Sequence, residues 1–278
     1  MLLYKNKNIF LKATSYKMNN LTLAQIKESC KKRGGYNSPE LNSILYLNHL
    51  GVTELCEMPE YRPKTIWLQG NGLIKLNHLM SSITCLYLQN NCIKEIHGLE
   101  ELSQLKELNL SHNMLMNLQG YIPITVETLY LSHNCISSSK ELGNLKNIQL
   151  TTLDISHNHI GDELITENTN NMGLKVFNME GNPGLKRVMA LRKRCVVKFT
   201  QLTYLNQSPV DESERRTSIA YFRGGITAER AERQAIIQEN RTKERNLIKS
   251  TLYSCSLSYA YSGSISKSTM DSRSSTDV

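Results

Sequence analysis

A short pattern of apolar residues and asparagine recurs along the chain about every 20 to 24 residues. In each copy two apolar residues flank one free position, and an Asn follows three residues after the second of them. A period of this size indicates a solenoid, in which each copy forms one coil and stacks on its neighbours. A weaker first copy has Leu50 where the others have Asn. The six full copies carry Asn71, Asn91, Asn113, Asn134, Asn158 and Asn182.

This pattern is the leucine-rich-repeat signature, and it predicts an α/β solenoid with short parallel strands on its concave face. The paired apolar residues point into the coil, because side chains alternate along a strand. The Asn follows where the chain turns, so its amide can bond backbone groups of the turn, and copies in adjacent coils can bond in a ladder. Losing one such amide is expected to cost about 1–3 kcal/mol. A curved surface without a built-in reactive site predicts docking rather than catalysis.

The composition divides the chain into six expected segments. Thr22 is expected to begin a helix, with Gln25 completing a capping box. The longer convex stretches 137–149 and 161–173 are expected to hold short helical turns. The segments are a flexible N-terminal extension (1–17), an N-terminal capping helix (18–40), six to seven leucine-rich repeats (41–183), a C-terminal cap (184–210), a charged helical segment (211–250) and a disordered Ser-rich tail (251–278).

Within the charged helical segment, Gly224-Gly225 is expected to interrupt the helix. Two pairs of opposite charge lie four residues apart there, and such pairs support an exposed helix. They are Glu229 with Arg233 and Glu239 with Lys243. The apolar residues of this segment form no continuous stripe, so a coiled coil is not expected.

The net charge of +8 is concentrated before the repeats. Residues 1–40 hold eight Lys or Arg and two acids, whereas residues 41–210 hold fourteen of each. A nucleic-acid reader carries its basic stripe on the folded face, so no nucleic-acid partner is expected. The chain has no run of 18 apolar residues and no secretory signal, so no membrane partner is expected. Seven cysteines without a Cys-x-x-Cys pair favour a reducing cytoplasm.

The sequence lacks the motifs of the common catalytic sites. It contains no Gly-rich phosphate loop, no His-Glu-x-x-His and no Gly-x-Ser-x-Gly, so we expect no enzyme and no cofactor. Three histidines, His112, His133 and His157, stand in register on consecutive coils, about 4.8 Å apart per step. They could hold a metal, but no carboxylate specific to them would orient the rings. We therefore predict no metal, and three solvent-facing histidines with ordinary pKa values at the rim of the concave face.

The outward position of each strand predicts a binding surface. Aromatic residues dominate the N-terminal half of this column, including Trp67, the only tryptophan. Adjacent rings can simply stack, at roughly 0.2–1 kcal/mol per pair. Exposed Trp and Tyr on a rigid surface are also typical of binding hot spots, and we favour partner contact. The predicted partner-binding residues are Tyr46, Trp67, Tyr87, Tyr130, Gln69, Gln89, Asn90, Asn109, His112, His133 and His157.

Segments outside the repeats resemble a known family. They are Cys30-Lys31-Lys32, Ser38-Pro39-Glu40-Leu41-Asn42, Leu202-Thr203-Tyr204-Leu205, Ala220-Tyr221-Phe222-Arg223-Gly224-Gly225 and Ala228-Glu229-Arg230-Ala231-Glu232-Arg233. Over about residues 18–250 the chain is similar to the dynein axonemal assembly factor 1 family. It departs from that family in having Phe222 for the usual Trp, Asn206-Gln207 for an acidic pair, and a short Ser-rich tail in place of a long acidic extension.

The resemblance implies a non-enzymatic protein-interaction scaffold required for cilium or flagellum assembly. Such a protein acts in the cytoplasmic preassembly of axonemal dynein arms and can also associate with the cilium. The implied partners are axonemal dynein chains and assembly chaperones, and a monomer is expected. Two alternatives stay open. One is a leucine-rich-repeat regulatory subunit of a protein phosphatase, which would also use the concave face. The other is a ribonucleoprotein scaffold, which would use the basic ends.

Overall fold

A computed structural model describes residues 19–161 and 173–270, with side chains described up to residue 252. The chain divides into two compact units, the first ending at Asp211 and the second beginning at Glu212. The expected extension 1–17 lies outside the described residues, as does most of the expected helical turn in 161–173.

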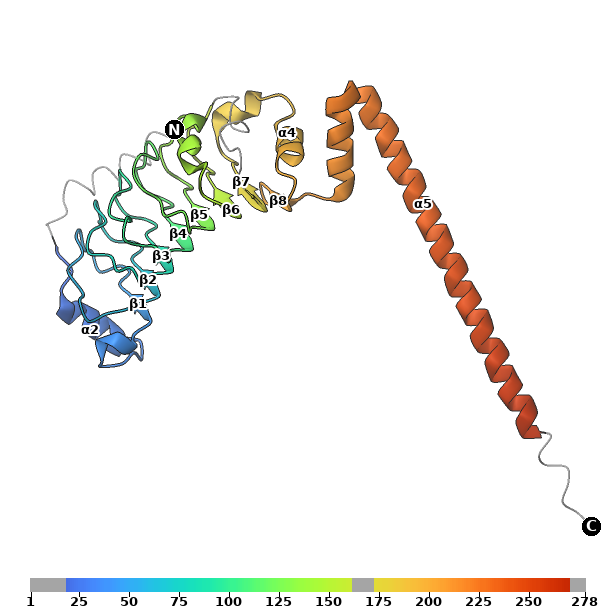
Figure 1. Ribbon diagram of the computed structural model, residues 1–278, viewed down its shortest axis with the longest axis horizontal. Coiled ribbons are helices and arrows are strands. Elements are labelled where there is room, and N and C mark those ends of the chain that lie inside the picture. The colour runs from blue at the N-terminus through green and yellow to red at the C-terminus, as the bar shows by residue number, and fades with distance from the viewer. Residues whose placement is uncertain (1–18, 162–172, 271–278) are drawn as a thin grey trace, which may run out of the picture. The chain divides into compact units, whose positions relative to one another are not determined.

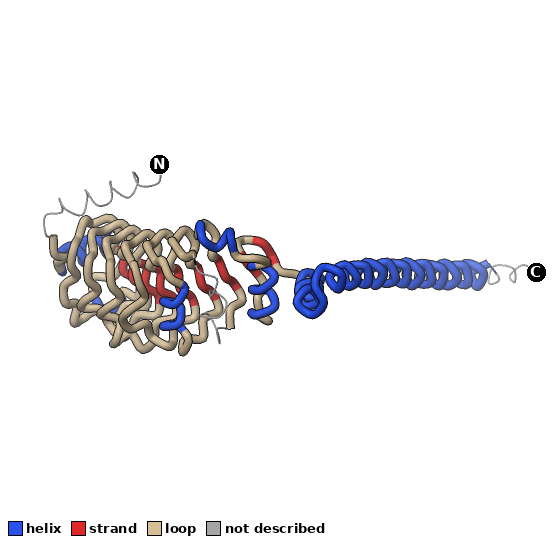
Figure 2. The backbone as a smooth tube through the Cα atoms, turned by 90° about the horizontal axis from the view of Figure 1, so that it is seen from above, coloured by secondary structure: helices blue, strands red, loops and turns tan. Residues whose placement is uncertain are grey.

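The first unit is a solenoid whose strands lie side by side on the inner side of its arc (Figures 1 and 2). Strand order follows chain order, and every neighbouring pair up to β8 is parallel, whereas β9 turns back antiparallel to β8. This confirms the predicted leucine-rich-repeat fold. The strands are β1 (Ile44–Tyr46), β2 (Thr65–Trp67), β3 (Cys85–Tyr87), β4 (Glu107–Asn109), β5 (Thr128–Tyr130), β6 (Thr152–Asp154), β7 (Val176–Asn178), β8 (Tyr204–Leu205) and β9 (Ser208–Pro209).

Alternation along each three-residue strand separates the core from the concave face. The middle residue is fully buried and the two flanking residues are half-buried or exposed, as a strand with one covered face requires. The buried set forms one continuous core from Leu21 to Leu205. The inward residues of β1 to β7 are Leu45, Ile66, Leu86, Leu108, Leu129, Leu153 and Phe177.

Each repeat Asn bonds backbone groups of its own coil and of the coil before it. Asn113 donates from Nδ2 to the carbonyls of Leu88 and Leu110, both at 3.0 Å. Its Oδ1 accepts the Ile93 N–H at 3.1 Å. The expected ladder therefore runs through the backbone rather than from amide to amide. The same contacts recur at Asn71, Asn91, Asn134, Asn158 and Asn182.

The direction of these bonds explains the N-terminal end of the array. No coil precedes the first one, so an Asn there would have no earlier backbone groups to bond. The sequence has Leu50 at this position. Its own backbone N–H groups are taken by Asn71, at 3.0 Å from Leu50 and 3.2 Å from Val52. At the other end Asn206 follows β8 and stands at the strand position of Asn178, so it is not a repeat Asn. Its Oδ1 takes the Met179 N–H at 2.9 Å, whereas in the coil before it a backbone carbonyl, that of Asn178, takes the equivalent N–H of Ile155 at 2.8 Å.

Short helices cover the two ends of the solenoid, and 3-10 turns lie in some of its connecting stretches. Helix α2 (Leu23–Lys32) begins at Thr22 with the predicted capping box and buries Ile26 and Cys30. At the other end α4 (Leu191–Lys198) follows the 3-10 turn η3 (Pro183–Arg187) and buries Cys195 and Val196. The turn η1 (Pro39–Leu41) precedes β1. The turn η2 (Ser139–Leu145) lies in the convex stretch where a helical turn was predicted.

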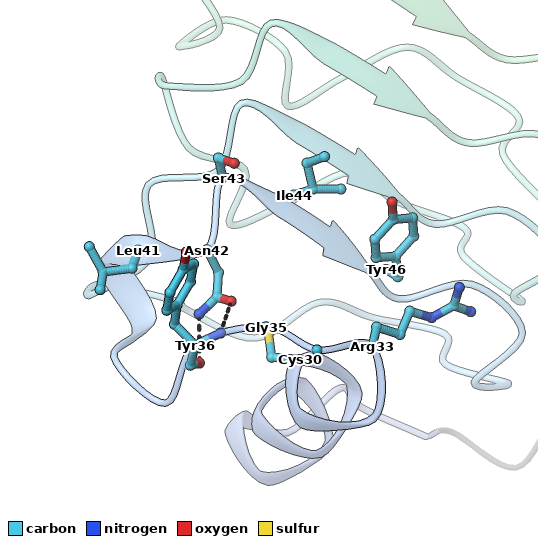
Figure 3. Close-up of a pocket in the computed structure, with 10 residues that line it drawn as sticks. Cys30, Arg33, Gly35, Tyr36, Leu41, Asn42, Ser43, Ile44 and Tyr46 are labelled. Atoms are coloured by element: carbon cyan, nitrogen blue, oxygen red, sulfur yellow. Dashed lines mark hydrogen bonds between the residues drawn. The ribbon is translucent and has the colours of Figure 1, made fainter.

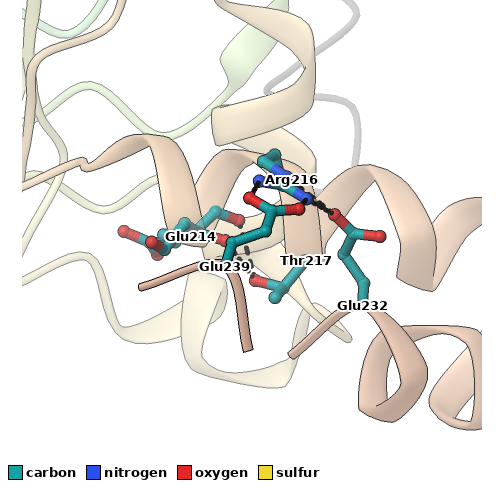
Figure 4. A network of polar contacts seen from close by, with 6 residues as sticks. Glu214, Arg216, Thr217, Glu232 and Glu239 are labelled. Carbon is teal, nitrogen blue, oxygen red and sulfur yellow. Dashed lines mark hydrogen bonds and ion pairs between the residues drawn. The ribbon is translucent and has the colours of Figure 1, made fainter. Parts of the chain in front are cut away.

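The second unit is one helix, α5 (Glu212–Met270), broken at the predicted glycine pair. Gly225 has φ +68° and ψ −158°, which only glycine adopts without strain. The break divides α5 into two legs, residues 212–223 and 226–270, which form a helical hairpin, and Arg216 joins them. Its Nε donates to Glu232 at 2.7 Å, and Nη1 and Nη2 donate to Glu239 at 2.7 and 2.8 Å (Figure 4).

Two expectations for α5 differ from the structure. The Glu229–Arg233 pair forms at 3.1 Å, but Glu239 hydrogen-bonds Arg216 across the hairpin rather than pairing with Lys243. The helix also continues past residue 250 to Met270, where a disordered tail was expected. This stretch contains no Pro, the residue that most strongly breaks a helix, and only one Gly. Residues 271–278 lie outside the described residues.

Candidate functional site on the concave face

A column of stacked aromatic rings runs across the first three strands. Tyr46, Trp67 and Tyr87 are the last residues of β1, β2 and β3 and stand in register. The Tyr46 and Trp67 ring centroids are 6.3 Å apart at an interplanar angle of 13°, and those of Trp67 and Tyr87 are 3.9 Å apart at 14°. All three side chains are half-buried, so the column has an accessible edge. The sequence predicted these residues on one face, and the structure brings them together.

A cation from the N-terminal cap begins this column. Arg33 ends α2, and its Cζ lies 4.7 Å from the centre of the Tyr46 ring, within the range of a cation–π contact. Figure 3 shows both residues beside a pocket of about 170 Å³ at the free edge of β1. Asn42 holds the far side of that pocket through hydrogen bonds to the backbone of Tyr36. The sequence did not predict Arg33 as part of the site.

The column is interrupted at β4. Asn109 stands in register after Tyr87, but its Oδ1 accepts the N–H of Ser111 at 3.0 Å. Its amide is thus held to its own backbone. Tyr130, the next aromatic residue, lies on β5 beyond this gap. The interruption separates a three-ring stack from a single tyrosine.

Carboxylates flank the two tyrosines on either side of the gap. Burial raises the pKa of Tyr87 to about 12, with further contributions from the charge and a hydrogen bond of Glu107. Burial also raises the pKa of Tyr130, and the charges of Glu107 and Asp154 act in the same direction. Glu107 is the first residue of β4 and is half-buried. Strand alternation places Glu107 on the same face as Asn109, and this was the signal in the sequence that could have identified it.

The predicted polar neighbours of the column are less available than expected. Gln69 and Gln89 are half-buried, and the Oε1 atom of each is enclosed with no hydrogen-bond partner among the described residues. Asn90 is exposed and has a left-handed backbone with φ +58°. Only Asn90 of these three therefore presents its whole side chain to a partner.

The residue before each repeat Asn forms a second column, in which every backbone is left-handed. Only residues that tolerate this conformation occur there, namely Gly, Asn and His. The restriction was visible in the sequence but was not recognised. The members, with φ between +53° and +74°, are His49, Gly70, Asn90, His112, His133, His157 and Gly181.

The three predicted histidines stack within this column. The His112 and His133 ring centroids are 4.1 Å apart at 10°, and those of His133 and His157 are 4.3 Å apart at 11°. The stack continues over Gly181, where an added Cβ would lie 2.4 Å from Nδ1 of His157. All three histidines are exposed at the rim, as predicted. Near-parallel rings do not aim their nitrogens at a common point, and the described residues contain no His, Cys, Asp or Glu group suited to a metal ion.

The expectation of ordinary pKa values is wrong for His112 and His133. Burial lowers the pKa of His112, and the charge of His157 lowers it further. Burial also lowers the pKa of His133. The charges of His112 and His157 act in the same direction, and that of Asp154 opposes them. Stacking removes water from the ring faces and places potential cations side by side, and both effects favour neutral imidazole.

The fold and the Asn ladder define the class of protein. The chain is a leucine-rich-repeat protein, and the family model described as Leucine Rich repeat matches residues 146–163. No helix in the described part of the chain is both long and apolar enough to cross a bilayer.

Sequence relatives confirm the resemblance to dynein axonemal assembly factor 1. The homolog from Drosophila melanogaster is 34% identical over 244 residues, which is 84% of this chain and 16% of that protein. The homolog from Anopheles gambiae is 36% identical over 241 residues, covering 84% of this chain and 26% of that protein. The chain thus spans about a quarter or less of the length of these relatives. A Drosophila melanogaster SNF/U2A′ complex structure is 19% identical over 80% of this chain and 99% of that chain, with a TM-score of 0.35, too low to bear on function.

Proposed function

We propose that this chain is a non-enzymatic protein-interaction scaffold for cilium and flagellum assembly, acting in the cytoplasmic preassembly of axonemal dynein arms. The names of its relatives support the assembly role. The leucine-rich-repeat fold supports a docking role, because such solenoids bind partners on an extended concave surface. Axonemal dynein chains and their assembly chaperones are the proposed partners.

One observation carries the proposal to particular residues, and it is the ring stack of Tyr46, Trp67 and Tyr87. Adjacent coils hold these rings rigidly, so a partner that contacts them orders few side chains on this surface. Trp and Tyr are also the residues most enriched among binding hot spots. The accessible edge of the stack lies on the concave face, where a partner that follows the curve reaches all three rings.

Substitution of the two closest rings tests this site. In the variant Trp67→Ala with Tyr87→Ala, we expect capture of axonemal dynein chains from a flagellated cell to fall at least about tenfold, or 1.4 kcal/mol. The matched control is Tyr121→Ala, which removes an exposed ring outside the strands. Circular dichroism of each variant checks the fold. Equal capture by the double variant and the wild type would show that this stack is not the docking site.

Depletion of the protein tests the assembly role. We expect axonemes lacking outer and inner dynein arms by electron microscopy, and normal arms would contradict the proposal. Capture of only a phosphatase catalytic subunit would favour the phosphatase alternative. Capture that depends on RNA would favour the ribonucleoprotein alternative.

A further inference from the structure

The aromatic column has no ring at β4, where the shorter Asn109 side chain stands, and we call this position the empty rung. Asn109 turns its amide to the N–H of Ser111, so no ring stands between Tyr87 on β3 and Tyr130 on β5. Strand positions two apart in a sheet are separated by about 9–10 Å. Asn109 stands between the two tyrosines, but its side chain is shorter than theirs. The outer parts of the two phenol rings can therefore take one planar group between them, since the neighbouring rings Trp67 and Tyr87 stack at 3.9 Å.

The charge next to the empty rung is negative and has no cation of its own. Glu107 lies on the same strand as Asn109, and its charge reaches both Tyr87 and Tyr130. In the described part of the chain, no Lys, Arg or His lies within ion-pair distance of Glu107. Lys106, its neighbour in sequence, pairs with Glu127. Lys64 donates to Gln104 at 3.0 Å.

Asp154 adds to the negative charge on this side of the face. Its two oxygens accept the Ser156 N–H at 2.8 Å and an Asn178 amide hydrogen at 3.3 Å. The charge of Asp154 acts on His133 and favours its protonated form. Burial and the neighbouring histidines outweigh this effect and lower the pKa of His133, so the imidazole tends to stay neutral. A partner that meets this half of the concave face therefore gains by supplying positive charge.

We propose that the empty rung is the seat of an arginine side chain of the protein partner, stacked between Tyr87 and Tyr130 and paired with Glu107. The inference rests on the proposed docking function and names the chemistry that the partner presents. The molecule already shows the cation–ring part of this arrangement, where its own Arg33 lies over the single ring of Tyr46 at the start of the same column. The partner's arginine completes an alternation of rings and cation along the concave face.

Arginine fits this seat better than lysine does. The guanidinium is planar, stacks on aromatic faces and is weakly hydrated, whereas an ammonium group is a compact and strongly hydrated charge. Its forked donors also match a carboxylate, and Glu107 offers one at the edge of the slot. A lysine could pair with Glu107 but would leave the two ring faces without a planar partner.

Trp67 provides a direct readout of binding, because it is the only tryptophan and its ring stacks on Tyr87. The full chain is titrated with a short Gly/Ser peptide that carries one central arginine, and the emission of Trp67 is followed. Matched peptides carry citrulline, which has the same shape without the charge, or lysine. We expect a saturable change with the arginine peptide, and at least about fivefold weaker binding of the other two.

The site is tested by Glu107→Gln, which preserves shape and removes the charge. Binding of the arginine peptide should be lost in this variant and retained in Glu127→Gln, which removes an exposed carboxylate that is already paired with Lys106. Circular dichroism confirms that both variants are folded. Equal binding of arginine and citrulline peptides would overturn the inference, and so would unchanged binding by Glu107→Gln. Tighter binding of the lysine peptide would overturn the assignment of arginine.

Partner capture separates this inference from the proposed function. Dynein chains could bind wild type and Glu107→Gln equally but fail to bind the Trp67 and Tyr87 double variant. This result would support the proposed docking function and contradict the arginine site. If arginine peptides bind through Glu107 but no dynein component is captured, the seat stands and the proposed function is wrong.

Discussion

Each repeat asparagine links two coils through at least three backbone groups, and its side chain is almost wholly buried. Asn113 is 7% exposed and satisfies two carbonyls and one N–H that have no access to water. An apolar substitution leaves these groups unpaired inside the solenoid, and an unpaired buried polar group is costly. The asparagines therefore stabilise the stacking of coils, not the individual strand.

For Asn113→Ala we expect a loss of unfolding free energy of about 1–3 kcal/mol in urea denaturation. The control is Asn117→Ala, which removes the same side chain where it makes one hydrogen bond, to the Gln119 N–H at 3.1 Å. That variant should lose less than about 1 kcal/mol. Similar losses in the two variants would show that the ladder contributes no more than an ordinary turn.

Glycine substitutions separate backbone strain from steric clash. Gly143→Ala meets open space at an ordinary φ and should be neutral or stabilising by up to about 1 kcal/mol. Gly51→Ala also meets open space but at φ +67°, so about 1–2 kcal/mol of strain is expected. Gly120→Ala adds a clash, because a Cβ would lie 1.8 Å from the Ile96 carbonyl oxygen at φ +119°. It should cost roughly 3 kcal/mol or more, and urea midpoints in any other order would contradict this account.

At the scale of elements, the histidine stack couples the loops after β4, β5 and β6. The folded protein holds His112 and His133 at pKa values below the ordinary 6.5, so as pH falls the unfolded chain binds protons first. The contribution of the stack to stability is therefore complete above about pH 6.5 and declines as pH falls from 6.5 toward the folded-state pKa values.

His133→Asn should reduce this pH dependence, because Asn tolerates φ +55° and cannot be protonated. We expect the loss of unfolding free energy between pH 7.5 and 5.5 to be smaller in this variant than in wild type. His159→Asn, at an exposed position outside the stack, should retain the wild-type difference. An unchanged pH dependence in His133→Asn would show that the stack does not sense protons.

The sequence was sufficient for features that depend on local periodicity. The strands, the buried middle residues and the capping box at Thr22 follow from spacing alone, and the aromatic column follows from alternation. Contacts between distant segments did not follow. Arg33 reaches Tyr46 only because the cap packs beside β1, and Glu107 acts on Tyr87 and Tyr130 only through strand register. Glu239 had a local candidate partner in Lys243, but the hairpin brings Arg216 to it.

At the scale of the whole molecule, the solenoid and α5 are separate compact units with different sources of order. The solenoid has a continuous apolar core, whereas the described part of α5 buries little besides Ser218 and Ile236. Its hairpin is instead held by charge, since the hydrogen bonds of Arg216 lower the pKa of Glu239. That contribution is present above the ordinary carboxyl pKa and is lost as pH falls through the lowered value.

Glu239→Gln should let the two legs of α5 separate more often, because the bidentate contact of Arg216 loses its charge. We expect faster tryptic cleavage after Arg223, at the glycine break, and a smaller difference from wild type at 1 M salt, at which the screening length is about 3 Å. Glu244→Gln is the control, since this exposed carboxylate makes no ion pair among the described residues. Equal cleavage of wild type and Glu239→Gln would mean that another contact closes the hairpin.

The one-way direction of the Asn ladder has a consequence for how the protein is made. The N–H of Ile93 is satisfied by Asn113, twenty residues further along the chain. As the polypeptide leaves the ribosome, each turn of the array thus remains incomplete until the following one has been synthesised. During synthesis the most recently made turn of the array therefore always lacks the asparagine that completes it.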